Sequence, residues 1–165
     1  MRVQIKTTQR PEPLYTPSQR KRRDESVWTL VQGILAPLQF LVFLISVWLV
    51  MRYLVTGIGY DIAAYSIVLK TVVLLTIMVT GAIWEKVVFG QYLLAPAFFW
   101  EDVVSFFVIA LHLAYVWALF ANYLTEQQLM ALGLTAYAVY LINAAQFVWK
   151  LRAARLQTVV EGEYA

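Results

Sequence analysis

Four long apolar stretches, separated by short polar or glycine-containing segments, set the pattern of the chain. Residues 28–51 carry no charge, residues 62–84 are interrupted only by Lys70, and two more stretches cover residues 103–123 and 127–149. A helix that rises 1.5 Å per residue needs roughly 20 apolar residues to cross the hydrocarbon core of a bilayer. The pattern therefore predicts an all-α, polytopic membrane protein with four transmembrane helices, at about 28–52, 62–84, 103–123 and 127–149.

The polar segments outside these spans predict two tails. Residues 1–26 are basic, and Thr16, Pro17 and Gln19 fit the start of a short interfacial helix, with a threonine cap, proline at the first helical position and glutamine three residues after the cap. We expect residues 1–15 to be mobile. Residues 27–155 are predicted to form the transmembrane domain and residues 156–165 a C-terminal tail.

The distribution of basic residues predicts the orientation of the chain. Seven of the thirteen lysines and arginines precede Asp24, and three more follow Trp149, whereas the loop near Tyr123 has none. Positively charged flanks stay in the cytoplasm, so we expect both termini on the cytoplasmic side. The same clusters are typical of anchors against anionic lipid rather than of a nucleic-acid-binding surface.

The connection between the second and third spans differs from an ordinary solvent loop. It starts with Glu85 and Lys86, continues as VVFGQYLLAPAFFW, and ends with Glu101 and Asp102. Apolar and aromatic residues fill it, but Gly90 and Pro96 make it too interrupted to span a membrane. We predict a cytoplasmic interfacial segment with its aromatic rings at the depth of the lipid headgroups.

Composition narrows the chemistry further. The chain of 165 residues is 61% hydrophobic and 14% charged, contains no cysteine, and has a single histidine, His112. These counts exclude disulfides, cysteine-ligated iron–sulfur clusters and haem held between two histidines. We therefore expect no cofactor, and an electron-carrier subunit is the less favoured alternative.

Ionisable and amide side chains inside the spans are the candidate site, because such groups are costly in a membrane. Glu101, Ser105 and His112 share one face of the third helix, with Glu101 and His112 roughly 16 Å apart along its axis. On the fourth helix Tyr140, Asn143 and Gln146 form a second polar stripe. Together the stripes predict a polar lining that opens toward the cytoplasm.

Each candidate also has a purely structural interpretation. Acids at the start of a helix, such as Glu101 and Asp102, are favoured by the helix dipole, and Glu85 beside Lys86 fits a surface ion pair. His112 and the amides fit hydrogen bonds between helices. Lys70 is expected to extend its amino group toward the non-cytoplasmic surface.

Several strings in the sequence resemble a known enzyme family. IWEKVVFGQYLLAPAFFWEDVVSFFVIALHLAY, from Ile83 to Tyr115, resembles the 3-vinyl bacteriochlorophyllide hydratases, and the resemblance extends from Leu14 to Gln157. It implies a hydro-lyase of bacteriochlorophyll synthesis in a bacterial inner membrane. The enzyme would add water across the C3 vinyl group of chlorophyllide a or 3-vinyl bacteriochlorophyllide. The alternative is a non-catalytic membrane factor that binds pigment or assembles other biosynthetic enzymes.

The implied reaction needs an acid to protonate the vinyl group and a base for the attacking water. A carboxyl in an apolar, aromatic setting is more easily kept protonated, so Glu101 is the expected acid and Glu85 its expected partner, with Asp102 as the alternative base. His112 is the expected ligand of the substrate's magnesium, or else Asn143 or Gln146. The aromatic residues expected to stack on the macrocycle are Trp84, Phe98, Phe99 and Trp100.

Overall fold

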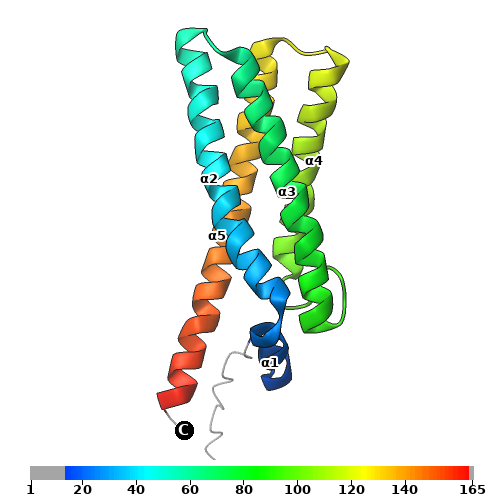
Figure 1. Cartoon of the computed structure of the whole chain (residues 1–165), viewed down its shortest axis with the longest axis vertical. Coiled ribbons are helices and arrows are strands. Elements are labelled where there is room, and N and C mark those ends of the chain that lie inside the picture. Colours follow the sequence, from blue (N-terminus) through cyan, green and yellow to red (C-terminus); the bar gives the residue numbers. More distant parts are fainter. Residues whose placement is uncertain (1–13, 164–165) are drawn as a thin grey trace, which may run out of the picture.

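The computed structural model describes residues 14–163, with side chains described as far as Arg155. The helices are α1 (Pro17–Glu25), α2 (Val27–Thr56), α3 (Tyr60–Phe89), α4 (Phe99–Ala121) and α5 (Glu126–Glu163), and residues 14–163 contain no strand (Figure 1). Helices α2 to α5 are each long and apolar enough to cross a membrane. The predicted all-α fold with four spans is therefore confirmed. The expected mobility of residues 1–13 lies outside the described part.

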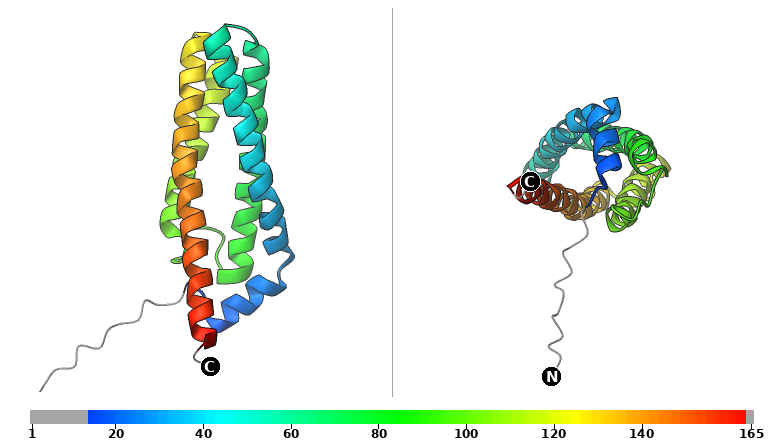
Figure 2. Two further views of the ribbon diagram at one scale, coloured as in Figure 1. Left: turned by 90° about the vertical axis from the view of Figure 1, so that its left-hand side faces the viewer. Right: turned by 90° about the horizontal axis from the view of Figure 1, so that it is seen from below.

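The four long helices form two antiparallel hairpins. Gly57, with a φ of 71°, and Gly59, with a φ of 94°, make the turn between α2 and α3 in the left-handed region that glycine adopts most easily. Thr125 and Gln128 form the predicted cap of α5, since each side chain bonds the other's backbone. Seen from below, the helices surround one axis, and α1, the α3–α4 connection and the end of α5 lie at the same end (Figure 2).

Two boundaries differ from the predicted spans. Helix α3 continues to Phe89 and α4 begins at Phe99, so the connection between them is 90–98. The charged residues that were expected at the two ends of the connection therefore belong to the last turns of α3 and the first turn of α4. Gly90 ends α3 with a φ of 91°. Helix α5 continues for 38 residues, past the predicted end at Trp149. A helix of 38 residues is longer than the hydrocarbon core of a bilayer is thick. Charged residues near its end can therefore lie outside the core, where they remain solvated.

An aromatic cluster closes the α1 end of the bundle. Tyr15 is only 3% exposed and stacks on Phe89 with 5.7 Å between ring centroids, while Phe98 packs edge-on against Trp84 and stacks on Phe147. Burial raises the pKa of Tyr15 against the opposing charge of Arg23, whose guanidinium lies 4.7 Å from the tyrosine ring. Tyr15 is thus a packed residue, and the expected mobility does not extend to it.

Lys70 points into the bundle instead of toward a membrane surface. Its side chain is fully buried, Nζ lies 3.6 Å from the centroid of the Tyr140 ring, and no hydrogen-bond partner for Nζ is present among the described residues. The predicted extension to the surface is therefore wrong. The face of α3 that carries Lys70 is turned toward α5, where the electron-rich face of an aromatic ring attracts a cation.

Replacing Lys70 by methionine is expected to stabilise the protein. A buried polar group without a hydrogen bond costs about 1–3 kcal/mol, the cation–π contact offsets part of this, and methionine fills a similar volume. We expect a net gain of about 1 kcal/mol, read as a higher unfolding midpoint in detergent. Lys86→Met, at an exposed lysine, is the matched control; a lower midpoint for Lys70→Met would contradict the prediction.

Candidate active site

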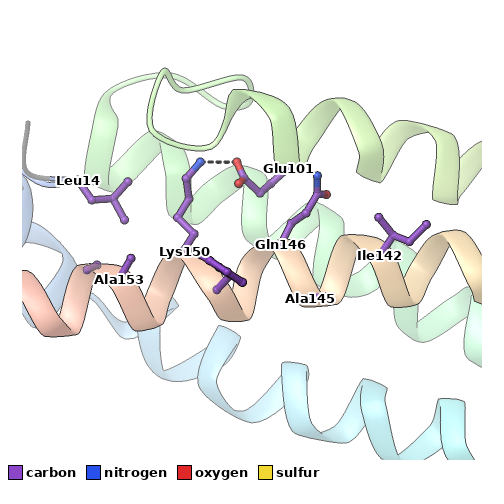
Figure 3. Close-up of a pocket in the computed structure, with 9 residues that line it drawn as sticks. Leu14, Glu101, Ile142, Ala145, Gln146, Lys150 and Ala153 are labelled. Carbon is purple, nitrogen blue, oxygen red and sulfur yellow. Dashed lines mark hydrogen bonds and ion pairs between the residues drawn. The ribbon is translucent and has the colours of Figure 1, made fainter. Parts of the chain in front are cut away.

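A pocket of about 640 Å³ lies beside the first turn of α4, along α5 (Figure 3). Three of its lining residues are polar, and the full lining is Leu14, Glu101, Ile142, Ala145, Gln146, Trp149, Lys150, Ala153 and Ala154. Apolar walls with a few polar groups at fixed places are typical of small-molecule sites of this size. The pocket therefore has the character of a site for a largely apolar ligand.

An ion pair forms the polar wall of the pocket. Lys150 Nζ lies 2.5 Å from Glu101 Oε2, and the Glu101 side chain is 9% exposed while that of Lys150 is 25% exposed (Figure 3). Lys150 Nζ also lies 5.2 Å from the centroid of the Phe98 ring. Sequence reasoning treated Lys150 only as a membrane flank. Its position four residues after Gln146 continues the polar stripe of α5, and that spacing was the available signal.

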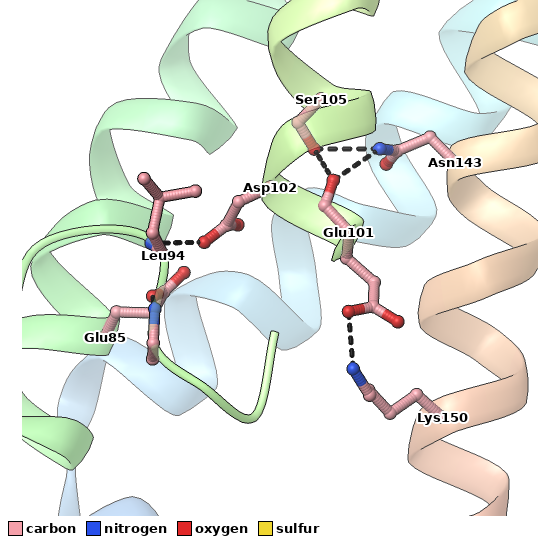
Figure 4. Close-up of polar contacts among 8 residues, drawn as sticks. Glu85, Leu94, Glu101, Asp102, Ser105, Asn143 and Lys150 are labelled. Atoms are coloured by element: carbon pink, nitrogen blue, oxygen red, sulfur yellow. Dashed lines mark hydrogen bonds and ion pairs between the residues drawn. The ribbon is translucent and has the colours of Figure 1, made fainter. Parts of the chain in front are cut away.

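Asn143 joins the two polar stripes. Its Nδ2 donates to the backbone oxygen of Glu101 and to Ser105 Oγ, both at 2.9 Å, while Ser105 Oγ donates to the same Glu101 oxygen at 2.8 Å (Figure 4). These bonds hold α5 against the first turn of α4. The predicted meeting of the stripes therefore occurs, and it determines where Glu101 stands relative to Lys150.

Glu85 and Asp102 form a separate carboxyl pair on the other side of α4. The Leu94 amide donates to Asp102 Oδ2 at 2.7 Å, and the Ala95 amide donates to Glu85 Oε2 at 3.2 Å. The two carboxyl groups thus accept from successive amides of the same connection. Both are nearly buried, and Figure 4 shows them facing the connection while Glu101 faces Lys150. The structure thus does not bring Glu101 and Glu85 together.

The carboxyl pair holds a strained connection. Leu94 has a φ of 59°, in the left-handed region that is costly for a bulky residue. Bonds from two successive amides to Asp102 and Glu85 stabilise that conformation. These two residues therefore shape the connection behind the pocket instead of lining it.

Two substitutions of Asp102 distinguish the effect of its hydrogen bond from the effect of its charge. Asparagine retains an oxygen that accepts a hydrogen bond from the Leu94 amide. The free energy of unfolding of Asp102→Asn is therefore expected to lie within about 0.5 kcal/mol of that of the unchanged protein. Alanine leaves the Leu94 amide unpaired, and Asp102→Ala is expected to lose about 1–3 kcal/mol. Chemical unfolding in detergent measures both. Equal losses for the two variants would show that the charge, not the bond, matters.

The aromatic residues expected to stack on a ligand do not line the pocket. Phe98 is 2% exposed within the aromatic cluster, and Trp84 Nε1 donates to Thr29 Oγ1 at 2.9 Å. Phe99 and Trp100 contact each other edge-on and face outward, with Trp100 68% exposed. Trp149 lines the pocket in their place. A tryptophan at the end of an apolar span is typical of the membrane interface, so its sequence position alone does not indicate a ligand contact.

His112 lies in the bundle interior, away from the pocket. It is fully buried, its Nδ1 lies 2.8 Å from the Val108 oxygen, and its ring centroid is 5.8 Å from that of Tyr137. A carbonyl oxygen only accepts, so Nδ1 carries a proton. Gln146, the other expected magnesium ligand beside Asn143, does line the pocket, and its Oε1 has no hydrogen-bond partner in the described part of the chain.

Comparison with known proteins identifies the family. The family model of 2-vinyl bacteriochlorophyllide hydratase matches residues 15–153. The 2-vinyl bacteriochlorophyllide hydratase of Rhodobacter capsulatus is 66% identical over 148 residues, covering 90% of this chain and 86% of the relative. That of Cereibacter sphaeroides is 69% identical over 143 residues, covering 87% and 89%. No solved structure matches the chain. Since the model and both relatives cover nearly all of the described helices, the chain belongs to the 2-vinyl bacteriochlorophyllide hydratase family.

Proposed function

We propose that this protein adds water across the ring vinyl group of a chlorophyllide or 3-vinyl bacteriochlorophyllide, giving a 1-hydroxyethyl group. The relatives are named 2-vinyl bacteriochlorophyllide hydratases, which supports a vinyl-bearing bacteriochlorophyllide as the substrate. The observation that carries the proposal is the largely apolar pocket in which Glu101, Lys150 and Gln146 are the polar residues. A membrane-embedded enzyme that acts on a flat, apolar pigment needs such a pocket.

The chemistry requires a proton donor near the vinyl group. Protonation of the terminal vinyl carbon places positive charge on the inner carbon, where the conjugated macrocycle delocalises it. Water then adds to the inner carbon and loses a proton. Glu101 is the proposed acid, because it is the only carboxyl residue that lines the described pocket. General acid catalysis of this kind contributes about 10²–10⁴-fold to a rate.

Binding of the pigment is proposed to use the α5 side of the pocket. Oxygen ligands suit magnesium, so Gln146, which lines the pocket and whose buried Oε1 has no hydrogen-bond partner among the described residues, would hold the substrate's magnesium after a side-chain rotation, and Trp149 would stack on the macrocycle. His112 is the weaker candidate, because it does not line the pocket. Glu85 and Asp102 support the site by holding the α3–α4 connection.

The orientation of the protein is also part of the proposal. Helix α1 and the C-terminal part of α5 lie at the same end of the bundle (Figure 1). Both carry basic residues, and Leu14, just before α1, and Lys150 of α5 line the pocket. The positive-inside rule places that end in the cytoplasm of a bacterial inner membrane, so the pocket opens where lipid headgroups supply water. Enzymes that make the substrate or oxidise the product are the proposed partners.

The function is tested by incubating the purified protein in detergent with chlorophyllide a. We expect the product to be heavier by one water and to have its long-wavelength absorption band shifted to the blue, because the vinyl conjugation is lost. In deuterium oxide the new methyl group gains one carbon-bound deuterium. The alternative, a pigment-binding or assembly factor, predicts bound chlorophyllide without any product.

A further inference from the structure

We infer that Lys150 is a second catalytic residue of this site and acts as the base for the attacking water while Glu101 acts as the acid. The inference rests on the proposed hydration reaction. It starts from the ion pair between Lys150 Nζ and Glu101 Oε2, both of which line the pocket. No other residue with an ionisable side chain lines this pocket in the described part of the chain.

The position of the pair allows one proton to pass directly between its members. Lys150 Nζ and Glu101 Oε2 form an ion pair with 2.5 Å between them. A flat macrocycle seated against Trp149 and Ile142 covers the pair and removes water from it. In an apolar environment the separated charges lose most of their solvation, which favours transfer of the proton from Lys150 to Glu101. The pair then consists of a carboxylic acid and a neutral amine.

The neutral pair supplies both halves of the addition. The Glu101 carboxylic acid gives its proton to the terminal vinyl carbon, and the electron pair of the vinyl double bond forms the new carbon–hydrogen bond. Water forms a carbon–oxygen bond to the inner carbon and loses one proton to the Lys150 amine. The sum is one water added to one double bond. The pair returns to carboxylate and ammonium without any outside proton.

The surroundings of Lys150 suit this task. Its amino group lies 5.2 Å from the centroid of the Phe98 ring. Among the described residues, Glu101 is the one carboxylate that forms an ion pair with Lys150. Its side chain is 25% exposed, so water reaches it more easily than it reaches Glu101. Lysine can lose a proton, whereas arginine cannot.

That difference provides the test. Lys150→Arg retains a cation beside Glu101 but removes the base, so turnover of chlorophyllide a is expected to fall at least ~100-fold while pigment binding, measured by fluorescence titration, stays within a factor of three. Lys86→Arg is the matched control, since Lys86 is exposed and contacts the oxygen of Gly90 and the ring of Tyr92, which do not line the pocket; it is expected to leave turnover unchanged.

A second variant tests the role of the amine itself. Lys150→Ala is expected to be inactive and to regain turnover when methylamine or ethylamine is added, in proportion to the neutral amine present, which a purely structural lysine would not show. Lys150→Arg that turns over within a factor of three of the unchanged protein overturns the inference. So does Lys150→Ala that binds pigment but does not respond to either amine. Absence of turnover in the unchanged protein would instead overturn the proposed function.

Discussion

Glu101→Gln is expected to lose nearly all turnover while still binding chlorophyllide. Glutamine has the shape of glutamate and its oxygen still accepts a hydrogen bond from Lys150, but its amide has no proton that can be given to carbon. A lost general acid lowers a rate by about 10²–10⁴-fold, so we expect a fall in that range. Product formation by mass spectrometry and binding by fluorescence titration measure the two effects separately.

The control for this substitution is Glu25→Gln at the end of α1. Glu25 is exposed, and within residues 14–155 its one ion pair is with Lys21, 3.9 Å away, so its loss is expected to leave turnover unchanged. If Glu101→Gln retained full turnover, the acid would have to be sought elsewhere, and the carboxyl pair of Glu85 and Asp102 would be the next candidate. The membership of the family would not be affected.

Phe98→Ala is expected to have the largest effect on stability. The Phe98 ring is 2% exposed and contacts four aromatic rings, those of Tyr15, Trp84, Phe89 and Phe147. Truncation of a buried phenylalanine costs about 3–5 kcal/mol, because apolar contact is lost and a cavity remains. We expect a loss in that range, together with release of α1 from the bundle, measured by unfolding in detergent and by proteolysis between Tyr15 and Val27.

Trp100→Ala is the matched control, since Trp100 lies two residues further along the same chain segment and is 68% exposed. Its truncation is expected to change the free energy of unfolding by less than about 0.5 kcal/mol. Similar losses for both variants would mean that the ring of Phe98 is not part of a packed cluster. Preserved proteolytic resistance in Phe98→Ala would show that α1 is held by other contacts.

The sequence predicts the contact between the polar stripes of α4 and α5 but not the ion pair of Glu101. The stripes of α4 and α5 meet as predicted, because helical spacing places Glu101, Ser105 and Asn143 on facing surfaces once the two helices are neighbours. The partner of Glu101 was not predicted. Lysine at the end of a span has the composition of a membrane anchor, and its distance from Glu101, 49 positions away along the chain, depends on the rotation of both helices.

Lys70 and the pair of Glu85 and Asp102 show the same limit. A lysine inside an apolar run is compatible with a side chain that reaches a membrane surface or with one turned into the bundle. Here the side chain is turned into the bundle, over the ring of Tyr140. Glu85 and Asp102 are distant from each other in sequence, and a fold in the 90–98 connection brings both to its backbone amides.

Taken by itself, the sequence determined the number of spans and their approximate positions, because these depend on the transfer of contiguous segments from water into lipid. It also determined the capped starts of α1 and α5, because a cap depends on hydrogen bonds between residues close together in the chain. The tertiary structure alone decided that Lys150 faces Glu101, that Lys70 is buried and that Phe98 closes the bundle end instead of facing a ligand. These outcomes depend on how far each helix rotates about its axis, and in a membrane that rotation is set by packing between helices rather than by hydropathy.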